Sequence, residues 1–106
     1  MSIIQDTIEG MTTAAYGGNT LKFNCRNREF KSISVVNGDA ALELTYYITG
    51  YFDANEKAFK VLKTATDLAA TEVYNLMVNT NQYDHITVFI KSKTLPIKYY
   101  VIQNFR

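Results

Sequence analysis

The stretch from Asp53 to about Asn79 constrains the fold most, because it is the longest segment in which apolar residues recur at helical spacing. Asp53 can cap a helix, and Glu56, three residues later, completes the pattern of a capping box. At about 100° per residue the apolar positions form one stripe. Its members are Ala58, Val61, Leu62, Ala65, Leu68, Ala69, Val73 and Leu76. The pattern predicts a long amphipathic helix that lies on a sheet.

The N-terminal segment predicts a second, shorter helix. Ser2 and Gln5 have the spacing of a helix cap, and Gly17-Gly18 would end the helix. The apolar face of this helix would consist of Ile4, Ile8, Met11 and Ala15. We expect it to pack beside the long helix.

The remaining segments alternate apolar and polar residues at period two, which predicts strands. The expected strands cover residues 20–26, 30–36, 42–52, 86–91 and 97–105. Asn37-Gly38 predicts a type I′ hairpin turn, and residues 92–96, with Pro96, predict a second hairpin bend. The core-facing side of the third strand would carry Leu42, Leu44, Tyr46, Ile48 and Phe52.

These elements together predict a single α+β domain over residues 1–106. The element order is α-β-β-β-α-β-β, with both helices on one face of a mainly antiparallel sheet of about five strands. The chain of 106 residues is 47% hydrophobic, which suits one packed core, and it contains no internal repeat or linker.

Charge and cysteine content exclude several classes of protein. Eleven basic and ten acidic residues give a net charge of +1, which argues against binding of polyanions over the whole surface. Cys25 is the single cysteine, so an internal disulfide and a multi-cysteine zinc site are excluded. The N-terminus lacks the pattern of a secretory signal, and no stretch is apolar enough to span a bilayer. We expect a cytoplasmic protein with no membrane partner.

Enzyme chemistry is not expected, and neither is a cofactor or a metal. The sequence contains no P-loop, dinucleotide-binding, zinc-protease, serine-hydrolase or EF-hand motif. His85 beside Asp84 could in principle act as a general base. However, adjacent residues of a strand point to opposite faces, so Asp84 is not expected to orient His85, and we interpret His85 as a solvated strand end.

Two further residues have competing interpretations. Cys25 follows the apolar phase of its strand and is interpreted as a small buried hydrophobe rather than a nucleophile. Glu72 lies at the edge of the helical stripe, where it is a perturbed acid, a member of an interface ion pair, or simply an exposed residue. We favour the exposed position, because glutamate is seldom fully buried.

The sheet face that the helices leave uncovered is the candidate binding surface. It combines aromatic and basic side chains, and its proposed members are Lys22, Arg26, Tyr47, Tyr51, Phe89, Lys91, Lys98 and Tyr100. Such a face suits a protein interface, including self-association into a homo-oligomer. The alternative is a single-stranded nucleic-acid platform using Tyr47, Phe89 and Tyr100. No strand carries the ribonucleoprotein motif, which favours the protein partner.

The predicted element order also has a likeness among known proteins. A leading helix, three strands, a long helix after the segment Tyr47-Ile48-Thr49-Gly50-Tyr51-Phe52-Asp53 and a final C-terminal strand look like the order in tail-terminator and related assembly proteins of tailed phages. The resemblance implies an assembly role, or a small phage- or mobile-element-borne antagonist of host defence. It identifies no functional residue.

Overall fold

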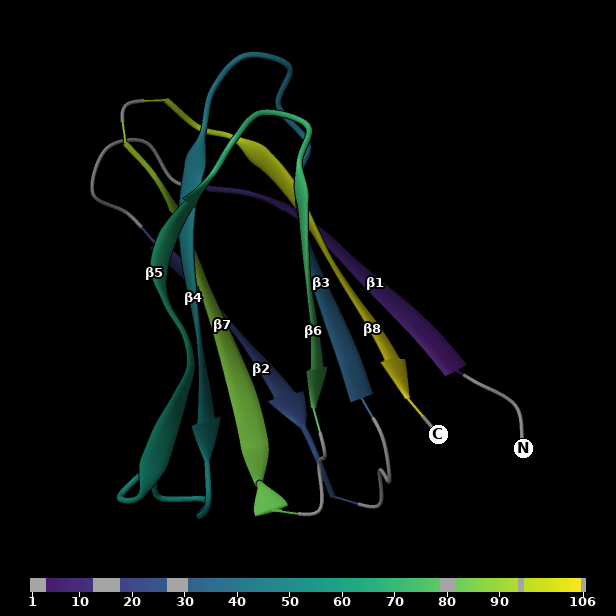
Figure 1. Cartoon of the computed structure of the whole chain (residues 1–106), viewed down its shortest axis with the longest axis vertical. Coiled ribbons are helices and arrows are strands. Elements are labelled where there is room, and N and C mark those ends of the chain that lie inside the picture. The colour runs from purple at the N-terminus through teal and green to yellow at the C-terminus, as the bar shows by residue number, and fades with distance from the viewer. Residues whose placement is uncertain (1–3, 13–17, 27–30, 79–81, 94, 106) are drawn as a thin grey trace.

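The structure is a computed structural model, and it describes residues 4–12, 18–26, 31–78, 82–93 and 95–105. Within these residues the chain forms eight strands and no α-helix (Figure 1). The strands are β1 (Ile4–Met11), β2 (Gly18–Asn24), β3 (Lys31–Asn37), β4 (Leu44–Tyr51), β5 (Phe59–Leu68), β6 (Val73–Val78), β7 (His85–Ser92) and β8 (Lys98–Phe105).

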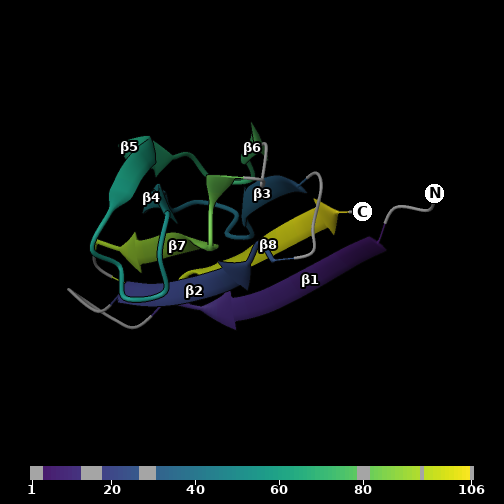
Figure 2. The same ribbon diagram turned by 90° about the horizontal axis from the view of Figure 1, so that it is seen from below.

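The strands form two antiparallel sheets of four. Sheet A has the order β1-β8-β3-β6 and sheet B the order β2-β7-β4-β5. Every connection between consecutive strands crosses from one sheet to the other, except β4 to β5, which stays within sheet B. Seen from below, β5 and β6 lie along one side of the molecule and β1 and β2 along the other (Figure 2). This topology is that of a jelly-roll β-sandwich.

The core lies between the two sheets and follows from the period-two pattern of the central strands. The fully buried side chains include Ile33, Val35, Leu44, Tyr46, Ile48, Ile86, Val88, Ile90 and Val101. Burying each aliphatic side chain of this size contributes about 1.5–3 kcal/mol. The inward alternation predicted for Leu44, Tyr46 and Ile48 is confirmed, whereas Phe52, which was predicted to share it, follows the end of β4 and is 42% exposed.

The predicted α+β class and its long helix are wrong. The stretch 53–79 instead contains a loop, β5, a turn at residues 69–72 and β6. The capping pattern at Asp53 marks a local turn, in which Asp53 Oδ1 accepts hydrogen bonds from the backbone N–H groups of Lys57 and Ala58, both at 3.0 Å. The same side-chain acceptor that caps helices therefore serves the loop between β4 and β5.

Bulges in β5 explain why its apolar residues mimic a helix. The pairing of β4 with β5 shifts register twice, between Tyr46 and Ile48 and between Ile48 and Thr49. Each shift inserts an extra residue and interrupts the alternation of faces. The buried and half-buried positions of β5 are consequently three or four residues apart in places, at Leu62, Lys63, Thr66 and Leu68. A bulged edge strand and an amphipathic helix thus leave a similar spacing in the sequence.

The predicted N-terminal helix is also wrong. Residues 4–11 form β1, which pairs with β8 along its whole length, from Ile4 opposite Phe105 to Met11 opposite Lys98. A short isolated helix is marginal in water, whereas β1 gains a full ladder of hydrogen bonds from β8. Ser2, Ala15 and Gly17 lie outside the described residues. Without either helix, the element order that resembled phage tail-terminator proteins is absent.

Five strands are found where the sequence predicts them, as β2, β3, β4, β7 and β8, but the two predicted hairpins are wrong. β3 and β4 belong to different sheets, as do β7 and β8. No described glycine has a positive φ, so Gly38 does not form a type I′ turn. Buried Asn37 instead donates its side-chain amide to the carbonyls of Leu42 (2.9 Å) and Leu68 (3.0 Å), which fixes the crossover.

Gly50 is required where β4 passes beneath Tyr83. A Cβ atom at this position would lie 2.6 Å from the Tyr83 ring, which is buried and stacks on Phe52 with centroids 5.2 Å apart. We expect Gly50→Ala to destabilise the protein by about 1–3 kcal/mol, because the ring must move. Thermal or chemical unfolding measures this. The double variant with Tyr83→Leu should lose less than the sum of the single variants, and strict additivity would contradict the proposed clash.

Candidate interaction surface

The outer face of sheet B carries a cluster of aromatic and apolar side chains, which we call the aromatic face. Its members are Tyr47, Tyr51, Phe59, Val61 and Phe89. Cross-strand register brings them together, since Tyr47 lies opposite Phe89, and Tyr51 lies opposite Phe59. The three most exposed members are Tyr47 at 38%, Val61 at 48% and Phe59 at 59%.

One end of the aromatic face is a stacked pair. The rings of Tyr47 and Phe89 are 4.8 Å apart and inclined by 20°. On its other side Phe89 covers Gly18 of β2, where a Cβ atom would lie 2.0 Å from the ring. Phe89 therefore lies between Tyr47 and the β2 backbone.

The other end is built around His85. Tyr51 stacks on the His85 ring at 4.9 Å and meets Phe59 in a tilted contact at 6.1 Å. His85 itself is fully buried. The loop between β4 and β5 reaches it through Glu56, whose backbone φ of 60° lies in the left-handed region that few non-glycine residues adopt. Through Glu56 and His85, the loop between β4 and β5 is thus connected to the Tyr51 end of the aromatic face.

The interpretation of His85 as a solvated strand end is wrong. Its Nδ1 lies 2.7 Å from Asp84 Oδ2, and its Nε2 lies 3.0 Å from Glu56 Oε1. An ionised carboxylate only accepts hydrogen bonds, so the ring nitrogen that carries a proton donates to the carboxylate it faces. Asp84 also accepts from Arg26 Nε at 2.9 Å. Hydrogen bonds from His85 and then from Arg26 hold the pKa of Asp84 below its ordinary value.

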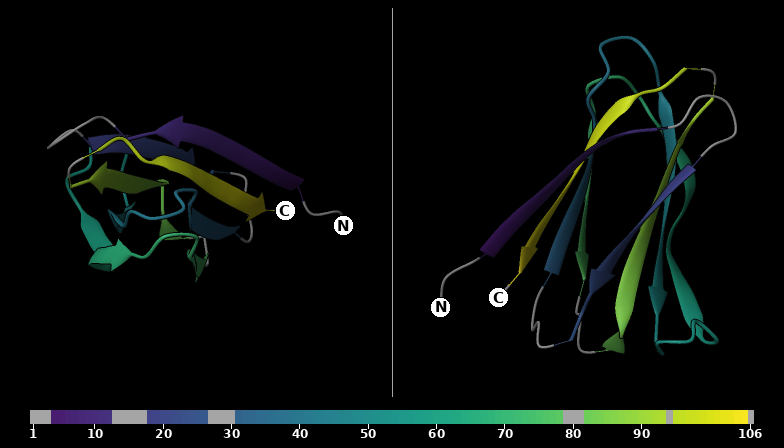
Figure 3. Two further views of the ribbon diagram at one scale, coloured as in Figure 1. Left: turned by 90° about the horizontal axis from the view of Figure 1, so that it is seen from above. Right: turned by 180° about the vertical axis from the view of Figure 1, so that it is seen from behind.

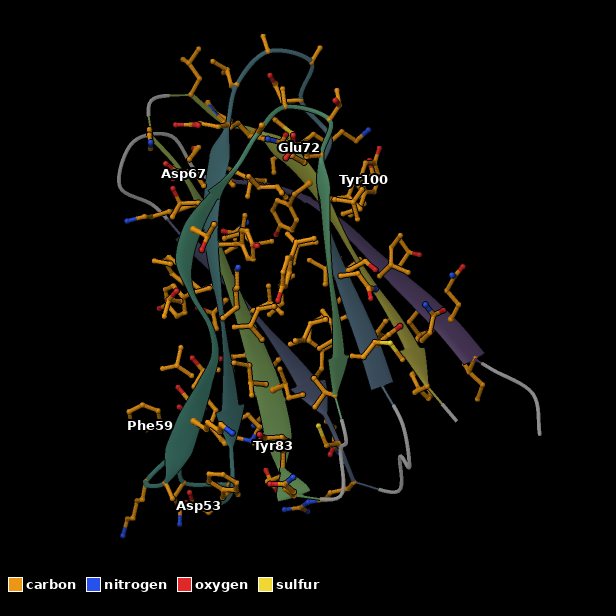
Figure 4. All side chains as sticks on the ribbon, in the orientation of Figure 1. Asp53, Phe59, Asp67, Glu72, Tyr83 and Tyr100 are labelled. Atoms are coloured by element: carbon orange, nitrogen blue, oxygen red, sulfur yellow. The ribbon has the colours of Figure 1, made fainter. Side chains whose placement is uncertain are left out.

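The structure divides the predicted binding residues between both sides of the sandwich. Lys22, Tyr47, Tyr51, Phe89 and Lys91 share the outer face of sheet B. Arg26 lies at the end of that face, where it forms an ion pair with Asp84, whereas Lys98 and Tyr100 lie on the outer face of sheet A. Figure 4 shows Tyr100 on the side of β6 and β8, away from Phe59. The assumption of a single sheet is therefore wrong, and Tyr100 cannot act together with Tyr47 and Phe89.

The outer face of sheet A has a different character from the aromatic face. Gln5 Nε2 donates to Asn104 Oδ1 at 3.1 Å, and Asn104 Nδ2 donates to Ser32 Oγ at 3.3 Å, which links three strands. Lys98 Nζ lies 2.7 Å from Glu9 Oε1. These polar groups on β1, β8 and β3 are therefore satisfied within the sheet, while the edge strand β6 exposes Val73 and Met77 on the same face.

The structure also places the two other residues with competing interpretations, Cys25 and Glu72. Cys25 is buried in the core, as predicted, and Glu72 is exposed, although in a turn rather than on a helix.

Among the described residues, no group of three or more His, Cys, Asp or Glu side chains is placed to hold a metal ion. In the same part of the chain, no helix has the length and apolar character needed to cross a membrane.

In its fold, this chain is similar to small β-sandwich proteins of known structure. No protein-family model and no curated protein matches the sequence. The solved structure of PirA aligns with a TM-score of 0.61 and 16% identity, covering 94% of this chain and 93% of that one. The Yersinia pseudotuberculosis-derived mitogen aligns with a TM-score of 0.62 and 8% identity, covering 94% and 84%.

A third similar structure is longer than this chain. The PBSX exported protein XepA aligns with a TM-score of 0.67 and 10% identity over 96% of this chain but 36% of its own. This chain therefore spans about a third of the length of XepA. At these identities the likenesses show the fold and no specific function.

Sequence reasoning missed Phe59, Val61 and the partners of His85. Phe59 and Val61 were assigned to a helix, although the β-branched residues of that stretch were a signal for a strand. The contact of His85 with Glu56 spans 29 residues of sequence and has no local signal.

Proposed function

We propose that the protein is a non-enzymatic binding module that contacts another protein through the aromatic face of sheet B. The observation that carries this proposal is the contrast between the two outer faces. Sheet A carries hydrogen-bonded polar side chains on β1, β8 and β3 and exposes aliphatic Val73 and Met77 on its edge strand β6, whereas sheet B exposes the aromatic Tyr47 and Phe59 together with Val61 in one cluster. Aromatic residues are enriched at protein interfaces, and contiguous exposed apolar surface marks such sites.

The charges around the aromatic face suit a partner with acidic residues at its rim. Lys22 and Lys91 flank the aromatic side chains, and neither forms an ion pair with a described residue. By contrast, Lys93 contacts Glu43 at 2.6 Å and Asp67 at 3.0 Å. Charges at the rim of an interface mainly steer association and specificity, while the apolar centre supplies affinity.

A single-stranded nucleic acid remains the alternative partner, and the ring geometry favours a protein over it. Bases stack on open ring faces. Both faces of Phe89 are occupied, one by Tyr47 and one by the backbone at Gly18. One face of Tyr51 is occupied by His85. The exposed rings of Tyr47 and Phe59 lie beside aliphatic Val61, and side chains of a protein can pack against such a mixed surface.

The environment of His85 supports a non-catalytic role. A general base must reach the proton that it abstracts. His85 is fully buried, and both ring nitrogens already contact carboxylates. His85, Asp84 and Glu56 hold the loop between β4 and β5 against sheet B, which supports the end of the aromatic face that contains Tyr51 and Phe59.

The double substitution Tyr47→Ser with Phe89→Ser tests the proposal. Truncating central aromatic residues commonly costs at least about 2 kcal/mol of binding free energy, or about thirtyfold in affinity. The wild-type protein and the double variant are each immobilised and exposed to an extract of the native host. We expect proteins that bind the wild type to be absent from the fraction bound by the double variant. Quantitative mass spectrometry of the bound fraction measures this, and circular dichroism checks that the fold persists.

Tyr100→Ser is the matched control, because it removes a half-buried tyrosine from the opposite outer face. It should leave the captured proteins unchanged. If it abolishes capture as strongly as the double variant, the aromatic face is not the interface. Binding of short labelled single-stranded oligonucleotides at micromolar concentration, with a steep salt dependence lost in the double variant, would instead favour the nucleic-acid alternative.

A further inference from the structure

We propose that β6 is a dimerisation strand, which pairs antiparallel with β6 of a second copy and joins the two A sheets into one continuous sheet. This surface is separate from the aromatic face, and the inference does not depend on the proposed function. β6 lies at the edge of sheet A, where it pairs with β3 alone. Figure 2 and the left view of Figure 3 show no strand of sheet A beyond it.

The backbone of β6 leaves a row of hydrogen-bonding groups on its open side. The N–H of Asn37 donates to the carbonyl of Glu72 at 3.0 Å, so the carbonyl just before β6 points toward β3. In an antiparallel ladder this direction alternates from residue to residue. The backbone groups of Tyr74, Leu76 and Val78 therefore face β3, and those of Val73, Asn75 and Met77 face outward.

The other three edge strands carry features that oppose pairing with a second copy, and β6 carries none. β1 contains two acidic residues and no basic one, and β2 contains Lys22. β5 contains Lys60 and Lys63 and has two register shifts. Charges, especially lysine, and bulges are the usual protection of sheet edges. β6, with the sequence VYNLMV, has no charge and no proline, and its register with β3 is regular.

The side chains of β6 are complementary to themselves under two-fold symmetry. Val73 and Met77 lie two residues before and two residues after Asn75, on the outer face, with exposed fractions of 57% and 66%. A two-fold axis through Asn75 places Val73 opposite Met77 of the second copy, twice, and Asn75 opposite itself. Each of these outward-facing pairs can exchange both backbone hydrogen bonds, about six in all. The same pairing brings the two exposed apolar side chains into contact with each other.

The inner side of β6 is already closed, so the second strand meets no open core. Tyr74 packs on Tyr46 at 5.3 Å, and Lys63 Nζ lies 4.7 Å from the Tyr74 ring. The dimer would leave the aromatic face of each copy uncovered, because that face belongs to the other sheet. Two copies would thus present two such faces.

Charge substitutions at the two-fold axis test this arrangement. Asn75 is exposed, so Asn75→Lys and Asn75→Glu should fold, and a cooperative thermal melt checks this. Each variant alone places like charges opposite each other across the axis and should weaken dimerisation by about tenfold or more. An equimolar mixture of the two variants places opposite charges together and should restore the dimer. Sedimentation velocity over a range of concentrations measures the dissociation constants.

Thr7→Lys is the matched control, because Thr7 is exposed on β1, the other edge of sheet A. It should leave the dimer intact, as should the double substitution at Tyr47 and Phe89. Wild-type protein that is monomeric at high micromolar concentration would overturn the inference. So would dimers that persist in both single-charge variants, a mixture that fails to dimerise, or a dimer that Thr7→Lys disrupts equally.

Discussion

Replacing Leu44 with alanine is expected to destabilise the protein by about 2–5 kcal/mol, the usual range for truncating a buried leucine. Leu44 lies on β4, between β7 and β5, and none of its surface is exposed. Both sheets enclose it, so the cavity left by the substitution cannot close without moving paired strands. The midpoint of urea unfolding at an unchanged slope measures the loss.

Leu62→Ala is the matched comparison for this prediction. Leu62 lies on the edge strand β5, where it is half-buried and packs against the rim of the core. We expect it to lower the free energy of unfolding by about 1–2 kcal/mol, since the substitution removes less buried apolar surface than Leu44→Ala does. Equal losses at both positions would mean that β5 is packed as tightly as β4, and no loss at Leu44 would contradict the inward assignment of that strand.

The sequence predicted the central strands well, because their inward positions are apolar at strict period two. In β7, for example, Ile86, Val88 and Ile90 are all fully buried. β4 and β7 pair with strands on both sides, so no bulged free edge disturbs their alternation of faces. For strands of this kind, the period-two alternation of apolar and polar residues is sufficient to predict the strand and its buried face.

The edge strands could not be predicted in the same way. β1 has a continuous ladder with β8, yet that partner is more than eighty residues away in sequence, beginning with Ile4 opposite Phe105. Local patterns such as the cap at Ser2 carry no information about such pairing. In β5 the bulges produce a spacing that a helix also produces, although Thr64, Thr66 and Val61 favour a strand. Long-range pairing overrode the local preference in both segments.

The candidate site was predictable only where its strands were. Alternation placed Tyr47, Tyr51 and Phe89 on one face, and the structure agrees. Tyr100 was assigned to the same side because one sheet was assumed, whereas the crossover after β7 takes β8 into the other sheet. Whether a residue lies on the same sheet is decided by the connections, which alternation cannot reveal.

The second large effect is expected from His85→Ala, which should cost about 2–4 kcal/mol. The substitution removes a fully buried ring that stacks on Tyr51 and leaves Asp84 and Glu56 without their shared partner. It should also raise the pKa of Asp84 toward its ordinary value, because the hydrogen bond from His85 is the largest cause of the lowering. Chemical unfolding at a series of pH values measures both effects.

The sign of the pH dependence follows from that lowered pKa. A carboxyl group whose pKa is lower in the folded state adds stability above its unfolded value of 3.8, and the contribution is lost as pH falls through the folded value. The difference between wild type and His85→Ala should therefore be largest near neutral pH and shrink below about 3.8. Glu56→Gln is the control, since its half-exposed side chain keeps an acceptor for His85 and should cost less than about 1 kcal/mol. Should His85→Ala cost no more than Glu56→Gln, or should the difference persist unchanged into acid, the histidine and its carboxylates do not hold the loop against sheet B.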